Sequence, residues 1–393
     1  MADTTGDYTI KDKLAIVGIG ETAYCKRGGS PVSEFALALQ AILAAAEDAG
    51  LPVAELGGFA SYSNDRNEPL RVAAGLGIPA ISFANMVWGG GGGGVCAAVG
   101  NAGAALVAGL AKYVVVYRSL AQGQYFRFGQ SGQARTVAGS MAYCAPYGVS
   151  TPAQQIALRT RRFMHEHGIG QDPLAAIALA SYYHAQFNPR AVMYGRPLSR
   201  EDYDNSRWIV EPFHLFDCCQ ENDGAAAVIL TTAERARDLR QRPAYVLAAT
   251  QGSGDRYALM SYASRPYASA NFETVAPRLY AMAGVEPKDV DVAQVYENFT
   301  GGVLMSIVEH GFCAPDEVME FVTEENLKAP DGRLPLNTSG GNLAECYMHG
   351  LELVTEAVRQ VRGTSTCQVP DAELSLVAGG PASAPVSSLI LRK

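Results

Sequence analysis

The chain has 393 residues, of which 48% are hydrophobic and 18% are charged, so it can bury a large core divided into two or three domain-sized units. Its net charge is -8, so the chain does not have the excess of Lys and Arg that binds nucleic acids, and this excludes nucleic-acid binding as its function. Near the N-terminus no basic stretch precedes an apolar run, and no apolar run is long enough to span a bilayer, so we expect a cytoplasmic protein that does not enter membranes.

The eight cysteines form no CxxC pair and no Cys/His cluster at the spacing of metal ligands, so we expect no metal site. In a reducing compartment most of them are predicted to be small buried apolar residues. The adjacent Cys218 and Cys219 are the exception, and a redox role there is the less favoured interpretation.

The N-terminal part of the chain alternates aliphatic runs with alanine-rich stretches. The run at 13–18 predicts a strand, and the Ala-rich and Leu-rich stretch at 33–49 predicts a helix. Six consecutive glycines at 89–94 precede a second helical stretch at 95–111, and a buried strand is predicted at 113–117. This order of loop, buried helix and buried strand is typical of an α/β protein.

Gly18 and Gly20 follow the first predicted strand, as in a dinucleotide-binding fingerprint. The next helix does not begin there, because Gly28, Gly29 and Pro31 intervene. We therefore interpret these glycines as a turn without a ligand.

The composition changes between residues 118 and 216, where aromatic residues, Arg, Gln and Pro are interleaved. Helical patterns occur within this region at 152–167 and 173–187. We interpret the region as an insertion that covers the α/β framework.

Regular alternation returns after this covering region and continues to the C-terminus. The predicted elements are, in order, a strand at 223–230, a helix at 233–239, a strand at 244–250, a helix at 274–283, a strand at 290–296, helices at 301–310 and 343–361, and strands at 374–378 and 387–391. Buried strands that each return through a helix predict an α/β fold with sheets covered on both faces.

The order of elements occurs twice, which predicts two similar halves. We expect the first half to comprise residues 1–117 and 217–250, the covering region to comprise residues 118–216, and the second half to comprise residues 251–393.

Three polar or glycine-rich motifs are candidates for chemistry. The backbone amides that follow the six glycines begin a helix, where they are placed to donate to a developing oxyanion, although a tight packing turn is the alternative. The predicted strand at 290–296 ends in Tyr296, Glu297, Asn298 and Phe299, at a strand end where α/β sheets place catalytic groups. The third motif is a polar turn at 337–342, followed by a Cys-Tyr-Met-His-Gly segment at 346–350.

Together these segments resemble the thiolase superfamily, and above all its sterol-carrier-protein-x and lipid-transfer-protein branch. The resemblance covers nearly the whole chain, and the segments that carry it are 15–18, the helix start after the glycines, 222–227, 296–299, Gly340-Gly341 and 378–380. It implies two similar βα halves in a five-layered arrangement, usually as a dimer.

The chain departs from thiolases at their catalytic positions. Glycine, near Gly92 or Gly93, stands where thiolases carry the nucleophilic Cys, and Cys96 lies about one helical turn too late. Tyr347 replaces the thiolase His, and Tyr296 replaces the Asn of the Asn-Glu-x-Phe motif. The late acid-base Cys of thiolases falls at 377–378, where this chain has Val and Ala. Without a thiolate and its His, ordinary thiolysis is not expected.

Tyr at both positions is similar to the steroid side-chain aldolases of this branch, which cleave a β-hydroxy acyl-CoA with a tertiary alcohol at steroid C17 into a 17-keto steroid and propionyl-CoA. Retro-aldol cleavage needs a base and a proton donor, so we assign Tyr296 as the base and Tyr347 as the proton donor and leave the reverse assignment open. In either role a phenol pKa of about 10 must be lowered or relayed. His349 and Asn298 are supporting candidates.

The glycines are the second group of expected site residues. Gly92 and Gly93, with Gly340 and Gly341, are expected to bind the substrate and the thioester oxygen, and the missing side chain near Gly92 is expected to leave room for the quaternary ring carbon.

The resemblance also implies partners: a second copy of the chain, and a small OB-fold, zinc-ribbon protein associated with a hydratase. No cofactor is expected apart from the coenzyme A of the substrate. Two alternatives remain open, namely a thiolase-like acyltransferase that uses Cys96 or Cys346, and a non-catalytic scaffold subunit.

Overall fold

The computed structural model describes residues 10–63, 65–125, 138–257 and 264–393. Its strands are β1 (Leu14–Glu21), β2 (Cys25–Lys26), β3 (Gly58–Tyr62), β4 (Phe83–Val87), β5 (Val114–Ala121), β6 (Trp208–Val210), β7 (Phe213–His214), β8 (Asn222–Thr232), β9 (Ala244–Gly252), β10 (Val292–Val295), β11 (Leu374–Gly379) and β12 (Val386–Arg392). Its α-helices are α1 (Glu34–Ala49), α2 (Pro69–Gly75), α3 (Val95–Val107), α4 (Pro152–His167), α5 (Asp172–Ala185), α6 (Arg200–Asp204), α7 (Ala233–Ala236), α8 (Ala276–Ala283), α9 (Thr300–Glu309), α10 (Val318–Phe321), α11 (Glu324–Leu327) and α12 (Leu351–Arg362).

Two sets of strands share one arrangement, as the sequence predicts. In the first half the order is β3-β5-β8-β1, with β3 and β5 parallel and the other neighbours antiparallel. In the second half the order is β10-β11-β12-β9, again with the first pair parallel and the others antiparallel. Strand β4 extends the first half beyond β3, and hydrogen bonds between β1 and β9 join the two halves into one sheet of ten strands.

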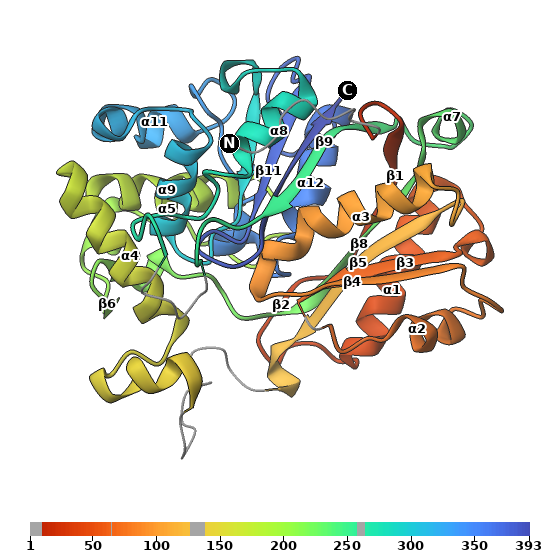
Figure 1. The fold of residues 1–393 in the computed structure, drawn as a ribbon, viewed down its shortest axis with the longest axis horizontal. Coiled ribbons are helices and arrows are strands. Elements are labelled where there is room, and N and C mark those ends of the chain that lie inside the picture. Colours follow the sequence, from red (N-terminus) through yellow and green to blue (C-terminus); the bar gives the residue numbers. More distant parts are fainter. Residues whose placement is uncertain (1–9, 64, 126–137, 258–263) are drawn as a thin grey trace.

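The helices complete an alternation of layers that is visible in Figure 1. Helix α1 packs on one face of the first half, whereas α3 contacts strands of both halves and lies between them. Helix α12 also contacts strands of both halves, and α8 covers β9 and β12 from the far side. The order of layers is therefore helix, strands of the first half, central helices, strands of the second half, helix, in agreement with the expected five layers.

Alternation of side chains along the strands explains this layering. Leu14 and Ile16 of β1 belong to the apolar core around α3 and α12, while Ala15 and Val17 belong to the core around α1. Successive residues of a strand point to opposite faces, so a strand that is apolar at every position must be covered on both sides.

Helices α4 and α5 cover the second half, where they contact α9 (Figure 1). Helix α4 begins at the N-cap Thr151, whose side chain forms a capping box with Gln154. In the described part of the chain, no helix has the length and apolar character that a membrane crossing requires.

Most predicted elements are confirmed to within a few residues, but two predictions are wrong. The helix expected at 343–361 is interrupted, because a π-helical turn at Gly341–Glu345 ends before α12 begins at Leu351. Gly18 and Gly20 lie within β1 and not in a turn, and a Cβ on either would approach a backbone oxygen of α1 to 2.2 Å. These two glycines therefore allow the helix to lie directly on the strand.

Candidate active site

Tyr296 directly follows β10, at the edge where the parallel strands β10 and β11 both end. Its amide donates to the carbonyl of Ala378 at 2.9 Å, which continues the ladder between the two strands and fixes the backbone. The side chain is only 1% exposed and lies in the apolar core between the halves. A strand end of this kind is where α/β sheets present polar groups.

The Tyr296 ring lies against the glycine loop. A Cβ on Gly92 would lie 2.2 Å from Cε2 of the ring, and a Cβ on Gly350 would lie 3.0 Å from its Cδ2. The expected space for a steroid ring carbon near Gly92 is therefore a wrong prediction, because the tyrosine ring fills it. Glycine is needed at this position to let the ring approach the backbone.

Tyr347 lies in the break between the π-helical turn and α12. Cys346 is extended with φ of −167°, and His349 and Gly350 have φ of 55° and 91°, so the chain cannot continue as a helix. The amide of Tyr347 donates to Oδ1 of Asn222, the first residue of β8, at 2.9 Å. A residue of the first half thus holds a side chain that belongs to the second.

The two phenols meet. The Tyr296 hydroxyl donates to the Tyr347 hydroxyl at 2.6 Å, with ring centroids 5.7 Å apart. The Tyr347 hydroxyl in turn hydrogen-bonds the thiol of Cys219, which packs against the same core. Two tyrosines that lie 51 positions apart in the sequence therefore form one hydrogen-bonded chain that ends on a cysteine.

Burial sets the protonation state of this chain. It raises the pKa of Tyr296 and of Tyr347 well above the ordinary value, and the coulombic interaction of each phenol with its neighbours acts in the same direction. It also raises the pKa of the Cys219 thiol to about 12. All three groups therefore carry their protons at neutral pH, so a free tyrosinate is not the resting form.

His349 lies beside the tyrosines, and its ring meets that of Tyr347 edge-on, at 5.1 Å between centroids and 90° between planes. Its Nδ1 is 3.0 Å from Nη2 of Arg118, a residue of β5. Arg118 forms a buried ion pair of 3.1 Å with Asp65. Burial, and then the charge of Arg118, hold the pKa of His349 well below its ordinary value.

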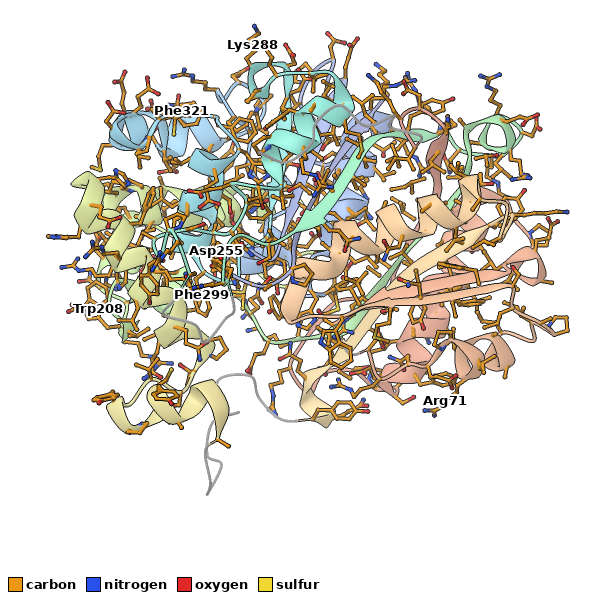
Figure 2. All side chains as sticks on the ribbon, viewed as in Figure 1. Arg71, Trp208, Asp255, Lys288, Phe299 and Phe321 are labelled. Carbon is orange, nitrogen blue, oxygen red and sulfur yellow. The ribbon has the colours of Figure 1, made fainter. Side chains whose placement is uncertain are left out.

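Asn298 does not face the phenols. Its Nδ2 donates to the carbonyl of Pro381 at 3.0 Å, and its Oδ1 accepts from the amide of Phe299 at 2.9 Å. Phe299, labelled in Figure 2, stacks on Phe213 of the covering region, with centroids 5.1 Å apart. These bonds engage the Asn298 side chain in anchoring the start of α9, so the structure gives no support to a catalytic role.

All four candidate glycines are closely packed. A Cβ on Gly93 would lie 1.9 Å from the carbonyl oxygen of Pro385, and one on Gly341 would lie 2.1 Å from Oε2 of Glu297. The amide of Gly340 already donates to the carbonyl of Asn337 at 2.9 Å, so it is not available to a thioester oxygen. The structure therefore gives no support to the expected oxyanion role of Gly340.

The thiols considered for acyl transfer lack the surroundings of a nucleophile. Burial raises the pKa of Cys96 to about 12, and the Cys96 amide and thiol contact Ser387 and Val377. Burial and nearby carboxylates raise the pKa of Cys346 well above the ordinary value. A reactive cysteine needs a lowered pKa, and the pKa of both thiols is raised.

Sequence reasoning missed Arg118, Asp65 and the role of Cys219. The signals were weak: Arg118 is a charged residue at the end of an aliphatic strand, and Cys219 is one of two adjacent cysteines. Arg118 lies 53 positions from Asp65 and 231 from His349, and Cys219 lies 128 positions from Tyr347, so no local pattern could reveal these contacts.

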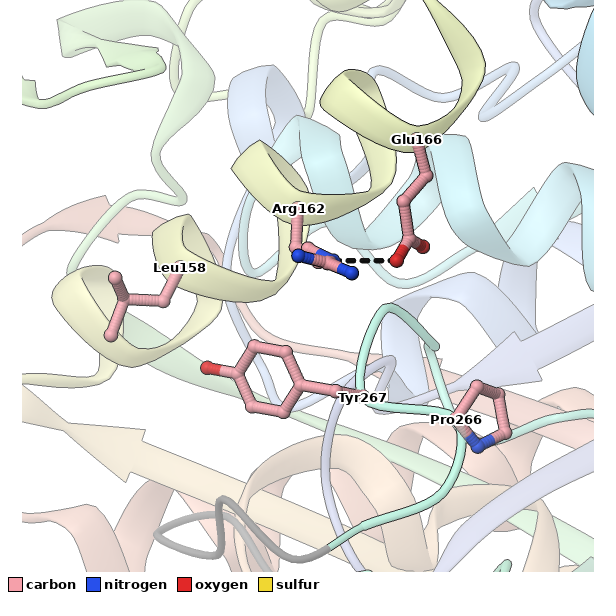
Figure 3. Close-up of a pocket in the computed structure, with 5 residues that line it drawn as sticks. All are labelled: Leu158, Arg162, Glu166, Pro266 and Tyr267. Atoms are coloured by element: carbon pink, nitrogen blue, oxygen red, sulfur yellow. Dashed lines mark hydrogen bonds and ion pairs between the residues drawn. The ribbon is translucent and has the colours of Figure 1, made fainter.

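A separate hollow lies where α4 of the covering region meets the segment that contains Pro266 and Tyr267, as Figure 3 shows. Its volume is about 640 Å³, and it is lined by Leu158, Arg162, Glu166, Pro266 and Tyr267. Arg162 pairs with Glu166 at 2.5 Å across its wall. None of these residues belongs to the tyrosine site.

Comparison with known proteins gives close relatives along the whole chain. Residues 252–393 match the family described as "Thiolase C-terminal domain-like". The chain is 42% identical over 384 residues to the steroid side-chain-cleaving aldolase of Thermomonospora curvata, covering 96% of this chain and 97% of that protein. It is 41% identical over 392 residues to the 17-hydroxy-3-oxo-4-pregnene-20-carboxyl-CoA lyase of Mycobacterium tuberculosis, covering 97% and 100%.

Solved structures agree. The "Ltp2-ChsH2(DUF35) aldolase" matches with a TM-score of 0.90 and 40% identity over 98% of each chain. Human mitochondrial 3-ketoacyl-CoA thiolase shares the fold, with a TM-score of 0.70 at 14% identity over 97% of this chain and 99% of that one. Both the fold and the close relatives show that the chain belongs to the thiolase superfamily, among the steroid side-chain-cleaving aldolases.

Proposed function

We propose that the protein cleaves a β-hydroxy acyl-CoA by a retro-aldol reaction, and that its substrate is a 17-hydroxy steroid with a C20-carboxyl-CoA side chain. The observation that carries this proposal is the 2.6 Å bond between Tyr296 and Tyr347, at the positions where thiolases carry Asn and His. The names of two relatives that each match 96% or more of the chain support the substrate class.

The reaction moves one proton in total. The substrate hydroxyl loses its proton and becomes a carbonyl, the carbon–carbon bond breaks, and its electron pair passes into the thioester enolate. Protonation of the enolate at its α carbon then gives propionyl-CoA. The reaction is redox-neutral, so it consumes no oxidant or reductant.

Two hydrogen-bonded phenols suit this balance. Tyr296 takes the hydroxyl proton as it passes its own to Tyr347, and Tyr347 delivers its proton to the α carbon. Each phenol gains one proton and loses one, so a raised pKa is no obstacle and no long-lived tyrosinate forms.

The proposed assembly contains a second copy of the chain and a small OB-fold, zinc-ribbon partner associated with a hydratase. Strand β4 supports the first part, because it is an edge strand beside the glycine loop, and Met86 within it and Trp88 directly after it are exposed. The name of the related aldolase structure, which joins two components, supports the second. Light scattering on the chain alone and on the co-expressed pair tests both, and a fully active monomer would contradict the dimer.

An assay with a panel of β-hydroxy acyl-CoA thioesters tests the reaction. We expect a 17-keto steroid and propionyl-CoA from the steroid substrate, and mass spectrometry of the protein after turnover should show no acyl-cysteine. An acyl group on Cys96 or Cys346 would instead establish an acyltransferase. Absence of cleavage both with and without the partner would favour a scaffold subunit.

A further inference from the structure

The buried guanidinium of Arg118 is held against Nδ1 of the His349 ring. Arg118 is 4% exposed, and its Nη1 donates to the carbonyl of Tyr62 at 2.8 Å while pairing with Asp65 at 3.1 Å. Its Nη2 lies 3.0 Å from Nδ1 of His349. Asp65 is itself held by the hydroxyl of Ser61 at 2.8 Å, so the guanidinium has one orientation.

This contact decides which nitrogen of the ring carries hydrogen. A guanidinium has only donors, so Nδ1 of His349 must accept, and the ring hydrogen must be on Nε2. Protonation of Nδ1 would place two cations against each other. The charges that act on the ring are those of Arg118 from β5 and Arg66 from the segment after β3, and the Tyr347 ring meets it edge-on. Asp65 pairs with Arg118, and the Tyr62 hydroxyl contacts the His349 backbone.

The backbone of the same residue is fixed as well. The Tyr62 hydroxyl donates to the carbonyl of His349 at 3.0 Å, and His349 adopts a φ of 55°. A left-handed backbone is unfavourable for a residue with a side chain, so the surrounding contacts must hold it there. His349 is 5% exposed and touches the ring of Tyr347.

We propose that His349 donates its Nε2 hydrogen to the thioester oxygen as the enolate forms, and that Arg118 and Asp65 are positioning residues that hold this tautomer. The proposal rests on the proposed retro-aldol reaction. It gives the enolate a side-chain donor in place of the Gly340 amide, which is already engaged. A neutral imidazole next to a proton-transfer group is a known way to stabilise an enolate, because its donor is oriented before charge develops.

The tautomer can be read without any activity. Ring ¹⁵N chemical shifts of the ¹⁵N-histidine-labelled full chain distinguish the two neutral tautomers and the cation, and His349→Gln identifies the His349 signals among the six histidines. We expect the Nε2–H form from pH 8 down to pH 5. An Nδ1–H ring, or an imidazolium at pH 7, would overturn the proposal whatever the substrate is.

Kinetics then separate the donor from its support. Removing one oxyanion donor lowers kcat by about 10² to 10³, so we expect this loss in His349→Ala and a smaller loss in His349→Gln, which retains an N–H. A kcat of His349→Ala within threefold of wild type, on a substrate that the wild type cleaves, would overturn the donor role.

Single loss of Arg118 would leave Asp65 as a lone buried charge, so the pair is best neutralised together as Arg118→Gln/Asp65→Asn. Without the cation His349 can accept a proton, so we expect an imidazolium signal below about pH 6 and a kcat–pH profile that differs from that of wild type. A folded double variant with the pH profile and ¹⁵N shifts of wild type would overturn the positioning role.

Discussion

Cys219 contacts the tyrosine pair through one hydrogen bond to Tyr347. Its thiol accepts the hydrogen bond of the Tyr347 hydroxyl, so in the resting protein it orients the phenol that we propose as the proton donor. Its neighbour Cys218 points elsewhere, and its thiol donates to the carbonyl of His214 at 3.5 Å.

We predict that Cys219→Ala lowers kcat by roughly 2-fold to 10-fold, which corresponds to one ordinary hydrogen bond. Cys219→Ser retains an acceptor and should lose less. Cys218→Ala is the matched control and should be close to wild type in steady-state kinetics. Equal losses in Cys218→Ala and Cys219→Ala would show that this segment matters only for packing.

At the scale of elements, the site depends on two interruptions of regular structure. The glycine turn before α3 lets the Tyr296 ring approach the backbone, and the break before α12 turns Tyr347 and His349 into the interior. The first interruption depends on the absence of a side chain at Gly92, and the second depends on the positive φ values of His349 and Gly350.

We predict that Gly92→Ala displaces the Tyr296 ring, because its Cβ would lie 2.2 Å from a ring carbon. Loss of the bond between the two phenols should lower kcat by about 10² or more, as deletion of a proton-transfer group does. Gly90→Ala is the control in the same loop, since a Cβ there would have nothing within 4 Å and φ is −91°. Wild-type rates in Gly92→Ala, with a normal melting temperature, would contradict this account.

The extent of sequence prediction differs between framework and site. Aliphatic strands and alanine-rich helices were predictable because burial on both faces leaves a periodic apolar pattern, as in α1 and β8. The strand β3 and the break at Cys346 were not predictable, because the local sequence gives no clear signal for either and both depend on tertiary contacts. The two tyrosines could be identified from the resemblance, but their bond, Cys219 and Arg118 depend on how the halves meet.

At the scale of the molecule, folding brings many carboxyl groups into the core. Burial raises the pKa of Glu352 to about 8, and its Oε2 has no hydrogen-bond partner among the described residues. Burial likewise raises the pKa of Glu297 and of Glu309 to about 7. A carboxyl group whose pKa is raised in the folded state contributes to stability at low pH. This contribution is lost as the pH rises through the pKa of the folded state.

We predict that Glu352→Gln raises the melting temperature relative to wild type at pH 8 to 9, and that the gap shrinks toward pH 5. The Gln side chain fits this site, because its oxygen can replace Oε1, which accepts from the Met348 backbone N–H at 3.1 Å. Its nitrogen can replace Oε2, which makes no hydrogen bond with the described residues. The buried His184 and His310 have lowered pKa values, so they affect stability only below about pH 6.5. A gap that is constant between pH 5 and 9 would show that Glu352 does not titrate on unfolding.

The central claim is that two phenols, and no cysteine, carry out the cleavage. Phe keeps the ring and its packing but deletes the hydroxyl, so Tyr296→Phe and Tyr347→Phe are the variants to measure, with Cys96→Ala as the control and thermal melts to verify folding. The substrate is the 17-hydroxy steroid C20-carboxyl-CoA, and the measured quantity is kcat.

We predict a loss of about 10² to 10⁴ in each Phe variant, a loss in the double variant that is smaller than the product of the two, and no loss in Cys96→Ala. Wild-type kcat in both Phe variants, or complete inactivity of a folded Cys96→Ala, would contradict the claim.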